Sequence, residues 1–318
     1  MTKILQIVPS LNSINGGVER GTLDIARELI KKGFESEVMS SGGIMAEKYK
    51  YKGVNHNEIE INKKGFINLL IVRRKFENML NEIKPDIVHI RSRWPAFCFN
   101  QIAKKNNIIT ALDNTWGTPL FLKPLEIGFD MSISSATKYF SGHSDVLVGT
   151  LAVNKKVFPK VNFYNRVSGY RTSPDDAYLV IRGLRTLDVR LERHEKNTRE
   201  VIKFLSKQKK IIEILYPHKK GTKNFKNWKK YYKGATGLLG LVIKAKSKNS
   251  VFTFVNKLEL FGIGYSWGGF ESLAVYQDIQ REFKKYKDKN LHIVRLHIGL
   301  EDPTDLINDL RSALRYVK

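Results

Sequence analysis

The chain has 318 residues, a formal net charge of +24 at pH 7 and a hydrophobic fraction of 42%. This length allows one large or two ordinary domains, and the composition is typical of a soluble globular protein. No apolar run is long enough to span a bilayer, and the single cysteine, Cys98, excludes an internal disulfide. We therefore expect a cytoplasmic protein without a membrane span, in which Cys98 is a buried packing thiol.

The strong positive charge raises the question of a nucleic-acid partner. The lysines are spread along the chain in clusters such as "KKYYKG" and "KAKSK", and no zinc-finger or RNP-like aromatic motif accompanies them. This pattern favours a solvated, lysine-rich surface and no specific nucleic-acid partner. Weak, salt-dependent attraction to anionic membranes or nucleic acids stays an alternative.

Strands and helices alternate over the first part of the chain. Buried strands are predicted at residues 3–11, 34–43 and 84–92, and amphipathic helices at 17–33 and 65–83. The first segment could also be a signal peptide, but Gln6, Pro9 and Asn12 interrupt it and it lacks a small-residue cleavage site. Strands that alternate with helices predict a Rossmann-like parallel α/β sheet.

The turn after the first strand, "NSINGGVERG", carries a glycine pair, Gly16 and Gly17. Such a pair allows close backbone approach, and the following helix N-terminus favours an anionic group, although a plain turn is commoner. Together with "KPDIVHIRSRWPAF", the turn makes residues 1–103 similar to the N-terminal domain of GT-B glycosyltransferases, which use nucleotide sugars. The resemblance implies that Gly16 and Gly17 face a cleft, with Glu19 at the helix start.

Nothing after residue 104 resembles the donor-binding domain of that family, which carries its own glycine loop and two spaced glutamates. A glycosyltransferase-related function is therefore the second choice. A helix at 95–107 and a strand at 108–115 would continue the alternation, and no Gly/Ser- or Pro-rich linker separates the two parts. We expect a tight or an ill-fitting join rather than two freely hinged domains.

Four stretches in the rest of the chain occur in order: "ALDNTWGTPLFLKPLEIGFDMSISSATKYFSGHSDVLVGT", "AYLVIRGLRTLDVRLERH", "YSWGGFESL" and "VRLHIGLEDPTDLINDL". They make residues 104–318 similar to cystathionine beta-lyase, a pyridoxal 5'-phosphate (PLP) enzyme of the fold type I, transsulfuration group. The resemblance implies a partial PLP-binding domain at 104–205, a C-terminal small α+β domain at 206–318 and a homo-oligomer. It also implies a place in methionine biosynthesis.

Lys138, in "SATKY", is the candidate catalytic residue, because PLP forms a Schiff base with a lysine amine. By resemblance Ser135 and Thr137 bind the cofactor phosphate, although they could equally be cap or turn residues. Asp113 ends a strand and could pair with the pyridine nitrogen, or be a turn starter.

Arg295 lies in an apolar strand, where its guanidinium could bind the carboxylate of an amino-acid substrate or form a structural ion pair. By resemblance Ser266 and Trp267 line the substrate side, and Trp267 favours a beta-lyase over gamma-acting relatives. No metal site is expected, and His143 and His297 are interpreted as local hydrogen-bonding residues.

The implied reaction is alpha,beta-elimination of cystathionine to homocysteine, pyruvate and ammonia. The family's phosphate-binding glycine turn, its stacking aromatic and the phosphate contacts lent to the neighbouring subunit have no counterpart in residues 1–103. Three hypotheses remain: an impaired PLP-dependent carbon–sulfur lyase, a glycosyltransferase relative, and an inactive gene fusion with a poorly packed join near residues 95–115.

Overall fold

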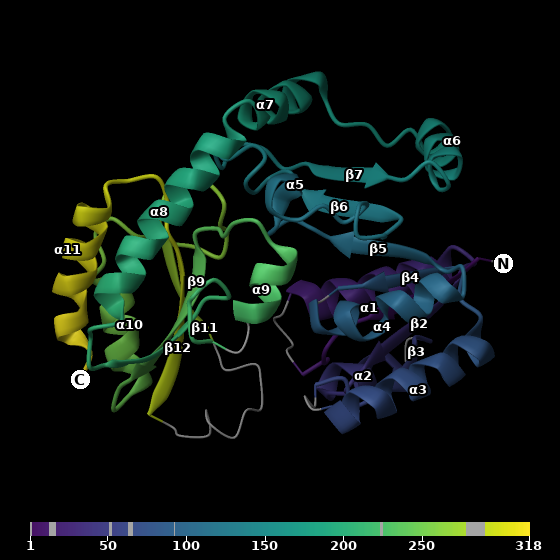
Figure 1. Ribbon diagram of the computed structural model, residues 1–318, viewed down its shortest axis with the longest axis horizontal. Helices are drawn as coiled ribbons and strands as arrows, with labels where there is room; N and C mark the ends of the chain where they lie inside the picture. The colour runs from purple at the N-terminus through teal and green to yellow at the C-terminus, as the bar shows by residue number, and fades with distance from the viewer. Residues whose placement is uncertain are drawn as a thin grey trace. The chain divides into compact units, whose positions relative to one another are not determined.

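The computed structural model describes residues 2–12, 17–50, 53–62, 66–91, 93–222, 225–277 and 290–318. The chain divides into two compact units (Figure 1). Unit 1 consists of Met1–Asn114, Pro124–Ile133 and Leu151–Tyr170; unit 2 consists of Thr115–Lys123, Ser134–Thr150 and Arg171–Lys318. Among the described helices, none combines the length and the apolar character needed to cross a membrane.

The first sheet has the strand order β3-β2-β1-β4-β5-β6-β7. Its strands are β1 Lys3–Ile7, β2 Glu35–Ser40, β3 Asn55–Glu58, β4 Ile87–Ile90, β5 Ile109–Asp113, β6 Met131–Ser135 and β7 Gly149–Val153. The pairs β1–β2, β1–β4, β2–β3, β4–β5 and β5–β6 are parallel. This confirms the predicted Rossmann-like parallel sheet.

Helices cover both faces of this sheet, as in other doubly wound folds. They are α1 Gly17–Lys31, α2 Ile44–Lys50, α3 Phe66–Ile83 and α4 Arg93–Lys105. Helix α6 Phe158–Ser168 follows β7 and has no buried residue among those described. In β2, Val38 packs with α1 and α2, whereas the next residue, Met39, packs with α3 and α4 on the other face. Helix α2 and strand β3 were not predicted, because seven residues are too few to show a helical period and the four residues of β3 are all polar.

The join near residue 104 is well packed. Phe99 of α4 lies against Phe76 of α3, with ring centroids 4.3 Å apart, and Ile102 and Ile108 belong to the same buried cluster. Cys98 is buried there as predicted, and burial raises the pKa of its thiol to about 11. The poorly packed join expected for an inactive fusion is therefore wrong, because the apolar side chains on both sides of the join share one core.

Unit 2 contains a second sheet of order β10-β11-β12-β9-β8. Its strands are β8 Ile211–Leu215, β9 Leu238–Lys244, β10 Gly262–Ile263, β11 Leu273–Gln277 and β12 Leu291–His297. The helices of this unit are α5 Thr118–Phe121, α7 Pro174–Leu184, α8 Leu187–Leu205, α9 Phe225–Tyr231, α10 Lys248–Asn256, α11 Pro303–Ala313 and the 3-10 helix η2 Leu314–Tyr316. The fold is the predicted mixture of a parallel α/β part and an α+β part, whereas the boundaries at 103/104 and 205/206 stay predictions.

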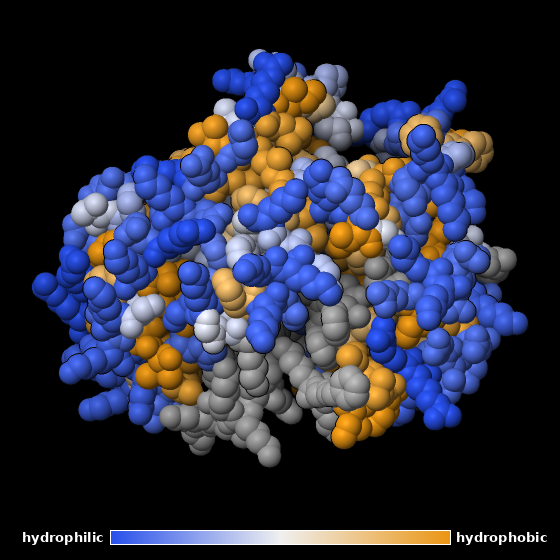
Figure 2. Space-filling model, in the orientation of Figure 1, coloured by the Kyte–Doolittle hydropathy of each residue, from blue (hydrophilic) through white to orange (hydrophobic). Residues whose placement is uncertain are grey.

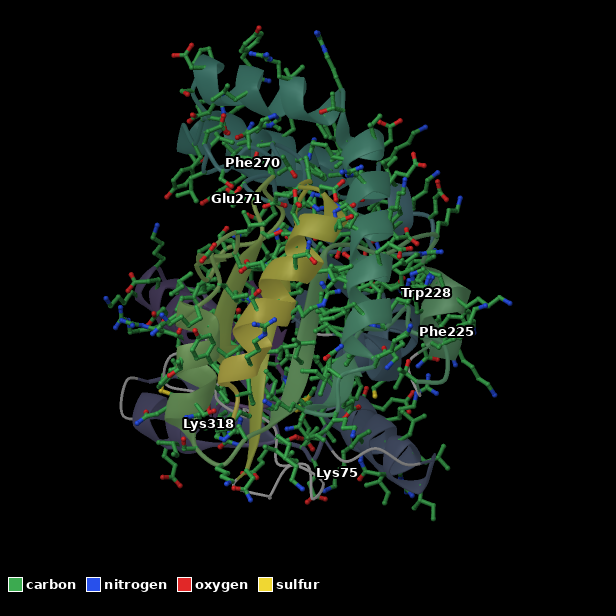
Figure 3. All side chains as sticks on the ribbon, turned by 90° about the vertical axis from the view of Figure 1, so that its left-hand side faces the viewer. Lys75, Phe225, Trp228, Phe270, Glu271 and Lys318 are labelled. Carbon is green, nitrogen blue, oxygen red and sulfur yellow. The ribbon has the colours of Figure 1, made fainter. Side chains whose placement is uncertain are left out.

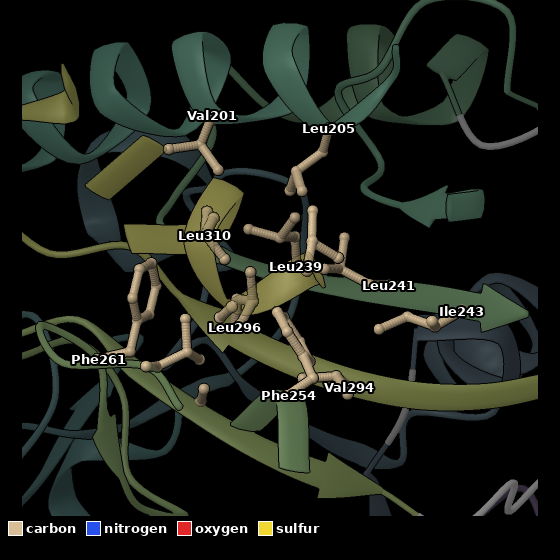
Figure 4. Close-up of a cluster of buried hydrophobic side chains, with 14 of the residues drawn as sticks. Val201, Leu205, Leu239, Leu241, Ile243, Phe254, Phe261, Val294, Leu296 and Leu310 are labelled. Atoms are coloured by element: carbon tan, nitrogen blue, oxygen red, sulfur yellow. The ribbon is translucent and has the colours of Figure 1, made fainter. Parts of the chain in front are cut away.

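One face of the second sheet is covered by helices, which bury a continuous hydrophobic cluster (Figure 4). Leu205 of α8 and Leu310 of α11 meet Val294 and Leu296 of β12 in this cluster. Because side chains alternate along a strand, Arg295, between those two buried residues, projects from the opposite face. The helix-covered core thus fixes the strand that carries one of the predicted site residues.

Candidate functional site

Lys138 lies in the turn that follows β6. Its backbone N–H donates to the Ser135 carbonyl at 3.1 Å, and its Nζ donates to Ser266 Oγ at 2.8 Å. The same Nζ lies 5.5 Å from the ring centroid of Trp267. Burial lowers the pKa of Lys138, and the charge of Arg295 lowers it further, which increases the fraction of nucleophilic neutral amine. Three predicted site residues therefore lie together; their roles stay predictions.

The turn at residues 136–141, here called the lysine turn, is held by the buried side chains of Arg190 and Tyr139, which the sequence analysis did not single out. Arg190 of α8 donates to the carbonyls of Tyr139 at 2.7 Å and Phe140 at 3.2 Å. Burial lowers the pKa of Arg190. The hydroxyl of buried Tyr139 accepts the Gly237 N–H at 3.2 Å. The two residues that follow Lys138 are thus fixed through their backbone carbonyls and through the Tyr139 hydroxyl.

The two predicted phosphate-binding hydroxyl residues have different surroundings. The Ser135 N–H donates to Thr115 Oγ1 at 2.8 Å. The Thr137 hydroxyl accepts the Val148 N–H at 3.0 Å and donates to the Val148 carbonyl over a long 3.4 Å. Thr137 would have to give up this weak bond before its proton could serve a phosphate, so Ser135 is the better placed donor of the two.

Arg295 is half-buried and faces carbonyl oxygens. Its Nη2 donates to the carbonyls of Gly264 and Ser266, each at 3.2 Å, and burial lowers its pKa. Among the residues that the structure describes, no carboxylate pairs with this guanidinium. Within that part of the chain the guanidinium does not form the structural ion pair that was the alternative, and it could bind an anionic group.

Asp113 is exposed at the carboxyl end of β5, in unit 1. Strand β4 pairs with β5 so that His89 lies opposite Ala111, which places Arg91, two residues on, opposite Asp113. Burial lowers the pKa of Arg91, and attraction to the carboxylates of Asp113 and Glu19 opposes that shift. Lys138 belongs to unit 2, so the predicted role of Asp113 toward a shared cofactor stays a prediction.

Arg91 is a residue that the sequence reasoning did not single out. Its Nη1 donates to Thr22 Oγ1 of α1 at 2.8 Å, and Glu19 lies in the first turn of that helix, as predicted. Gly17 is the first residue of α1, and Gly16 lies outside the described residues. A cation from the glycosyltransferase-like part thus stands beside the carboxylate predicted to bind a pyridine ring.

A cleft of about 430 Å³ lies in unit 1 at the opposite end of the strands. Its lining includes Lys84 and Asp86 before β4, Asn107 before β5, and Lys156 and Lys160 at the start of α6. None of the predicted site residues contributes to it. Across the described ranges, no group of three or more His, Cys, Asp or Glu side chains is close enough to hold a metal ion.

Comparison with known proteins gives two family matches. The family described as Cys/Met metabolism PLP-dependent enzyme matches residues 98–315, and Glycosyltransferase Family 4 matches residues 15–129. A cystathionine beta-lyase of Bordetella avium is 38% identical over 67% of this chain, and an L-alanine/L-glutamate racemase of Wolbachia pipientis wMel is 37% identical over 67%. The matched region is 54% of either relative, so the chain spans about half the length of the curated relatives it matches.

A solved structure shows the same fold. The cystathionine gamma synthase of Xanthomonas oryzae pv. oryzae, solved in complex with aminoacrylate and cysteine, aligns with a TM-score of 0.73 at 24% identity. The alignment covers 99% of this chain and 75% of that chain. Both resemblances predicted from the sequence are therefore confirmed. Since the first family match extends over more than half of its residues, this chain belongs to the family of Cys/Met metabolism PLP-dependent enzymes.

Proposed function

We propose that the chain is a PLP-dependent carbon–sulfur lyase that eliminates the thiol of cystathionine, yielding homocysteine, pyruvate and ammonia. The observation that carries the proposal is the half-buried amine of Lys138, which is held by Ser266 beside Trp267 within one compact unit. The similarity to a cystathionine beta-lyase supports this substrate. A cytoplasmic location and a role in methionine biosynthesis belong to the same proposal.

The described residues of unit 2 fit a bound PLP. The Lys138 amine, with its lowered pKa, would hold the cofactor aldehyde, and the Ser135 hydroxyl, aided by Thr137, would hold the phosphate. Asp113 belongs to unit 1 and keeps its predicted role as the partner of the pyridine nitrogen. When bound, PLP supplies an electron sink that stabilises negative charge at the substrate alpha carbon.

The chain's own residues would then handle the substrate. Arg295 would bind the alpha-carboxylate through its fork of N–H donors, which now contact only carbonyls among the described residues. The Lys138 Nζ would accept the alpha proton, and Ser266 would orient that amine. Trp267 would shield the site from water and select the substrate side chain.

We propose that cofactor binding is weaker than in complete relatives. Residues 1–103 offer no counterpart for the family's stacking aromatic or its glycine turn, and each lost charge-assisted hydrogen bond costs about 1.5–3 kcal/mol. The guanidinium of Arg91 beside Asp113 adds a competing charge. The glycosyltransferase-related alternative rests on the match over residues 15–129, which leaves most of unit 2 unexplained.

An amino-acid racemase is a second candidate. The similarity to the L-alanine/L-glutamate racemase favours it, since racemisation also begins with removal of the alpha proton by a positioned base. The two reactions differ in their second step, in which a lyase expels the beta substituent whereas a racemase returns the proton. By resemblance, Trp267 in "YSWGGFESL" favours a beta-lyase over gamma-acting relatives only, so the products of the reaction are what separate a lyase from a racemase.

We also propose a homo-oligomer. No described residue of α6 is buried, and its aromatic and aliphatic side chains Phe163, Tyr164 and Val167 are 70%, 60% and 70% exposed. Figure 2 shows such hydrophobic residues at the surface among mainly hydrophilic ones. Exposed apolar groups of this kind mark contact surfaces between protein chains. Light scattering of the purified chain, compared with Val167→Lys, measures this directly.

One assay tests the function. The purified chain is saturated with PLP and given either cystathionine, with pyruvate as the readout, or L-alanine, with D-alanine as the readout. Pyruvate that disappears in Lys138→Ala supports the lyase, and D-alanine without pyruvate supports the racemase. Neither product at saturating cofactor would contradict both assignments.

A further inference from the structure

The imidazole of His297, at the end of β12, is bonded through both of its nitrogens. Its Nε2 lies 2.9 Å from the Gly268 nitrogen, and its Nδ1 lies 3.1 Å from the Glu271 carbonyl. A backbone N–H can only donate and a carbonyl can only accept, so Nε2 is bare and Nδ1 carries the proton. The ring is therefore neutral and in one tautomer, and it ties together both ends of a four-residue segment.

That segment is pressed against the lysine turn. Gly268 adopts φ +86°, and a Cβ there would lie 2.9 Å from the Tyr139 nitrogen and 3.0 Å from Lys138 Cβ. Glycine is thus required both for the backbone conformation and for the close approach. Because Gly268 directly follows Ser266 and Trp267 in "SWGG", its position sets where these two side chains meet Lys138.

The far end of the segment has further anchors. The carboxylate of Glu271, which is labelled beside Phe270 in Figure 3, accepts a hydrogen bond from the Ser144 hydroxyl, with 2.7 Å between Oγ and Oε1. The Ser272 N–H donates to Glu301 Oε1 at 2.6 Å. These bonds fix residues 271 and 272, whereas the Gly268 amide is held by its hydrogen bond to His297.

We propose that His297 is a positioning residue of the site: by accepting the Gly268 amide, it holds Ser266 and Trp267 against Lys138. This deepens the proposed lyase function, and its consequence for catalysis rests on that function. The positioning itself concerns the protein without cofactor. The sequence interpretation of His297 as a local hydrogen-bonding residue did not identify what the bond controls.

The surroundings keep the ring neutral over the whole working range of pH. His297 is almost fully buried, and burial lowers its pKa to about 3. The titratable groups that face it are His194 of α8, Tyr139 and Lys138 of the lysine turn, and Arg295 on its own strand. The charges of Lys138 and Arg295 also disfavour protonation. The bond to Gly268 should therefore not change between pH 5 and 9.

Two substitutions distinguish the effect of losing the hydrogen-bond acceptor Nε2 from the effect of losing the volume of the His297 ring. His297→Leu removes the acceptor, whereas His297→Gln can place an amide oxygen near the former Nε2. Hydrogen exchange of the 265–272 segment is measured without PLP, together with the rate at which an acylating reagent modifies Lys138. In His297→Leu we expect the Gly268 amide to exchange at least about tenfold faster. Lys138 should also react several-fold faster, and His297→Gln should restore most of both.

His194→Leu is the matched control. His194 is also a buried imidazole, 5.2 Å from the His297 ring, but its hydrogen bond is to the Ile298 carbonyl at 2.7 Å. His194→Leu should lower the stability of unit 2, but the Gly268 amide should still exchange more slowly than its neighbours. Equal loss of protection in His194→Leu and His297→Leu, or unchanged exchange in His297→Leu, would overturn the proposal.

The unsubstituted protein offers a second test in case His297→Leu does not fold. Nitrogen NMR should show a bare Nε2 and a protonated Nδ1 on His297 at pH 7, unchanged down to pH 5. A protonated Nε2, or a titration near pH 6.5, would contradict the proposed role. Neither measurement needs PLP, so a chain that fails to bind the cofactor would end the lyase proposal without affecting this result.

Discussion

The parallel sheet of unit 1 and the candidate site of unit 2 respond differently to the mixed ancestry of the chain. In the sheet, β4, which only the glycosyltransferase family matches, pairs in regular register with β5, which both families match, and Phe76 packs on Phe99 in one core. At the ends of these strands, Arg91 lies in the glycosyltransferase match alone, whereas Asp113 lies where the two matches overlap. In unit 2, by contrast, Lys138 has its partner in Ser266, from the same family match.

Apolar packing and polar site groups tolerate a change of sequence family to different degrees. Backbone ladders and apolar packing require only the right strand spacing and volume, so a second family can supply them. Polar site groups require specific partners at specific distances, so they persist where both partners come from one family. Substitutions in both regions test this contrast.

Lys138→Ala should abolish pyruvate formation from cystathionine, because no other described amine is bonded to Ser266 beside Trp267. The measurement is pyruvate release at saturating PLP. Lys155→Ala, at a lysine that is exposed at the surface, is the control and should leave the rate unchanged. Equal rates in Lys138→Ala and the unsubstituted chain would assign the proton transfer to another group.

Arg295→Leu should raise the cystathionine concentration for half-maximal rate by about 100-fold, since a bidentate carboxylate contact is lost. It should also raise the pKa of Lys138, because the charge of Arg295 now contributes to lowering it. The pH dependence of Lys138 modification measures the second effect. An unchanged pH profile would show that the guanidinium does not act on the amine.

Phe99→Ala should lower the free energy of unfolding by about 3–5 kcal/mol, because the ring fills the core at the join. Phe163→Ala, which removes a ring that is 70% exposed, should change it by less than about 0.5 kcal/mol in the monomer. Chemical denaturation measures both. If both substitutions lowered the free energy of unfolding by similarly small amounts, the residues at the join would not form a tightly packed core.

Stability should fall as the pH is lowered from about 6.5 to 4. Burial lowers the pKa of His194 to about 4 and that of His297 to about 3, so the unfolded chain takes up protons first. The stabilising contribution is fully present above pH 6.5 and is lost as the pH approaches the folded values. Denaturation across this range should show a shallower loss in His194→Gln.

Arg91→Gln should tighten PLP binding about three- to tenfold, because in the proposed role of Asp113 the nearby cation competes with the ring nitrogen for its carboxylate. Arg20→Gln makes the same charge change at an exposed arginine of α1 that pairs with Asp24, and it should have little effect. Absorbance titration with PLP compares the two. Equal changes of PLP affinity in the two variants would show that the effect comes from net charge alone.

Much of this architecture could be predicted from the sequence. Strong periodicity gave β1, α1 and α3, and four ordered motifs gave the lyase-like part. The polar residues Arg190, His194 and Asn197 of α8 were missed, although they share the three- and four-residue spacing of the buried Leu191 and Val201. Their partners are backbone carbonyls distant in sequence, which a pattern of residue types does not reveal.

The candidate site also contains some features that could be predicted from the sequence and others that could not. Lys138, Ser266 and Trp267 were grouped through the family resemblance, and the structure places them within one unit. The pairing of Arg91 with Asp113 could not be predicted, because it depends on the register between β4 and β5, which a pattern of residue types does not reveal.

The most direct test of the account is to add PLP to the purified chain, reduce it with borohydride and map the labelled peptide. We expect a stable label on Lys138 that is lost in Lys138→Ala, since the amine and its partner Ser266 lie together in unit 2. Absence of label at saturating PLP, or label spread over surface lysines, would contradict it.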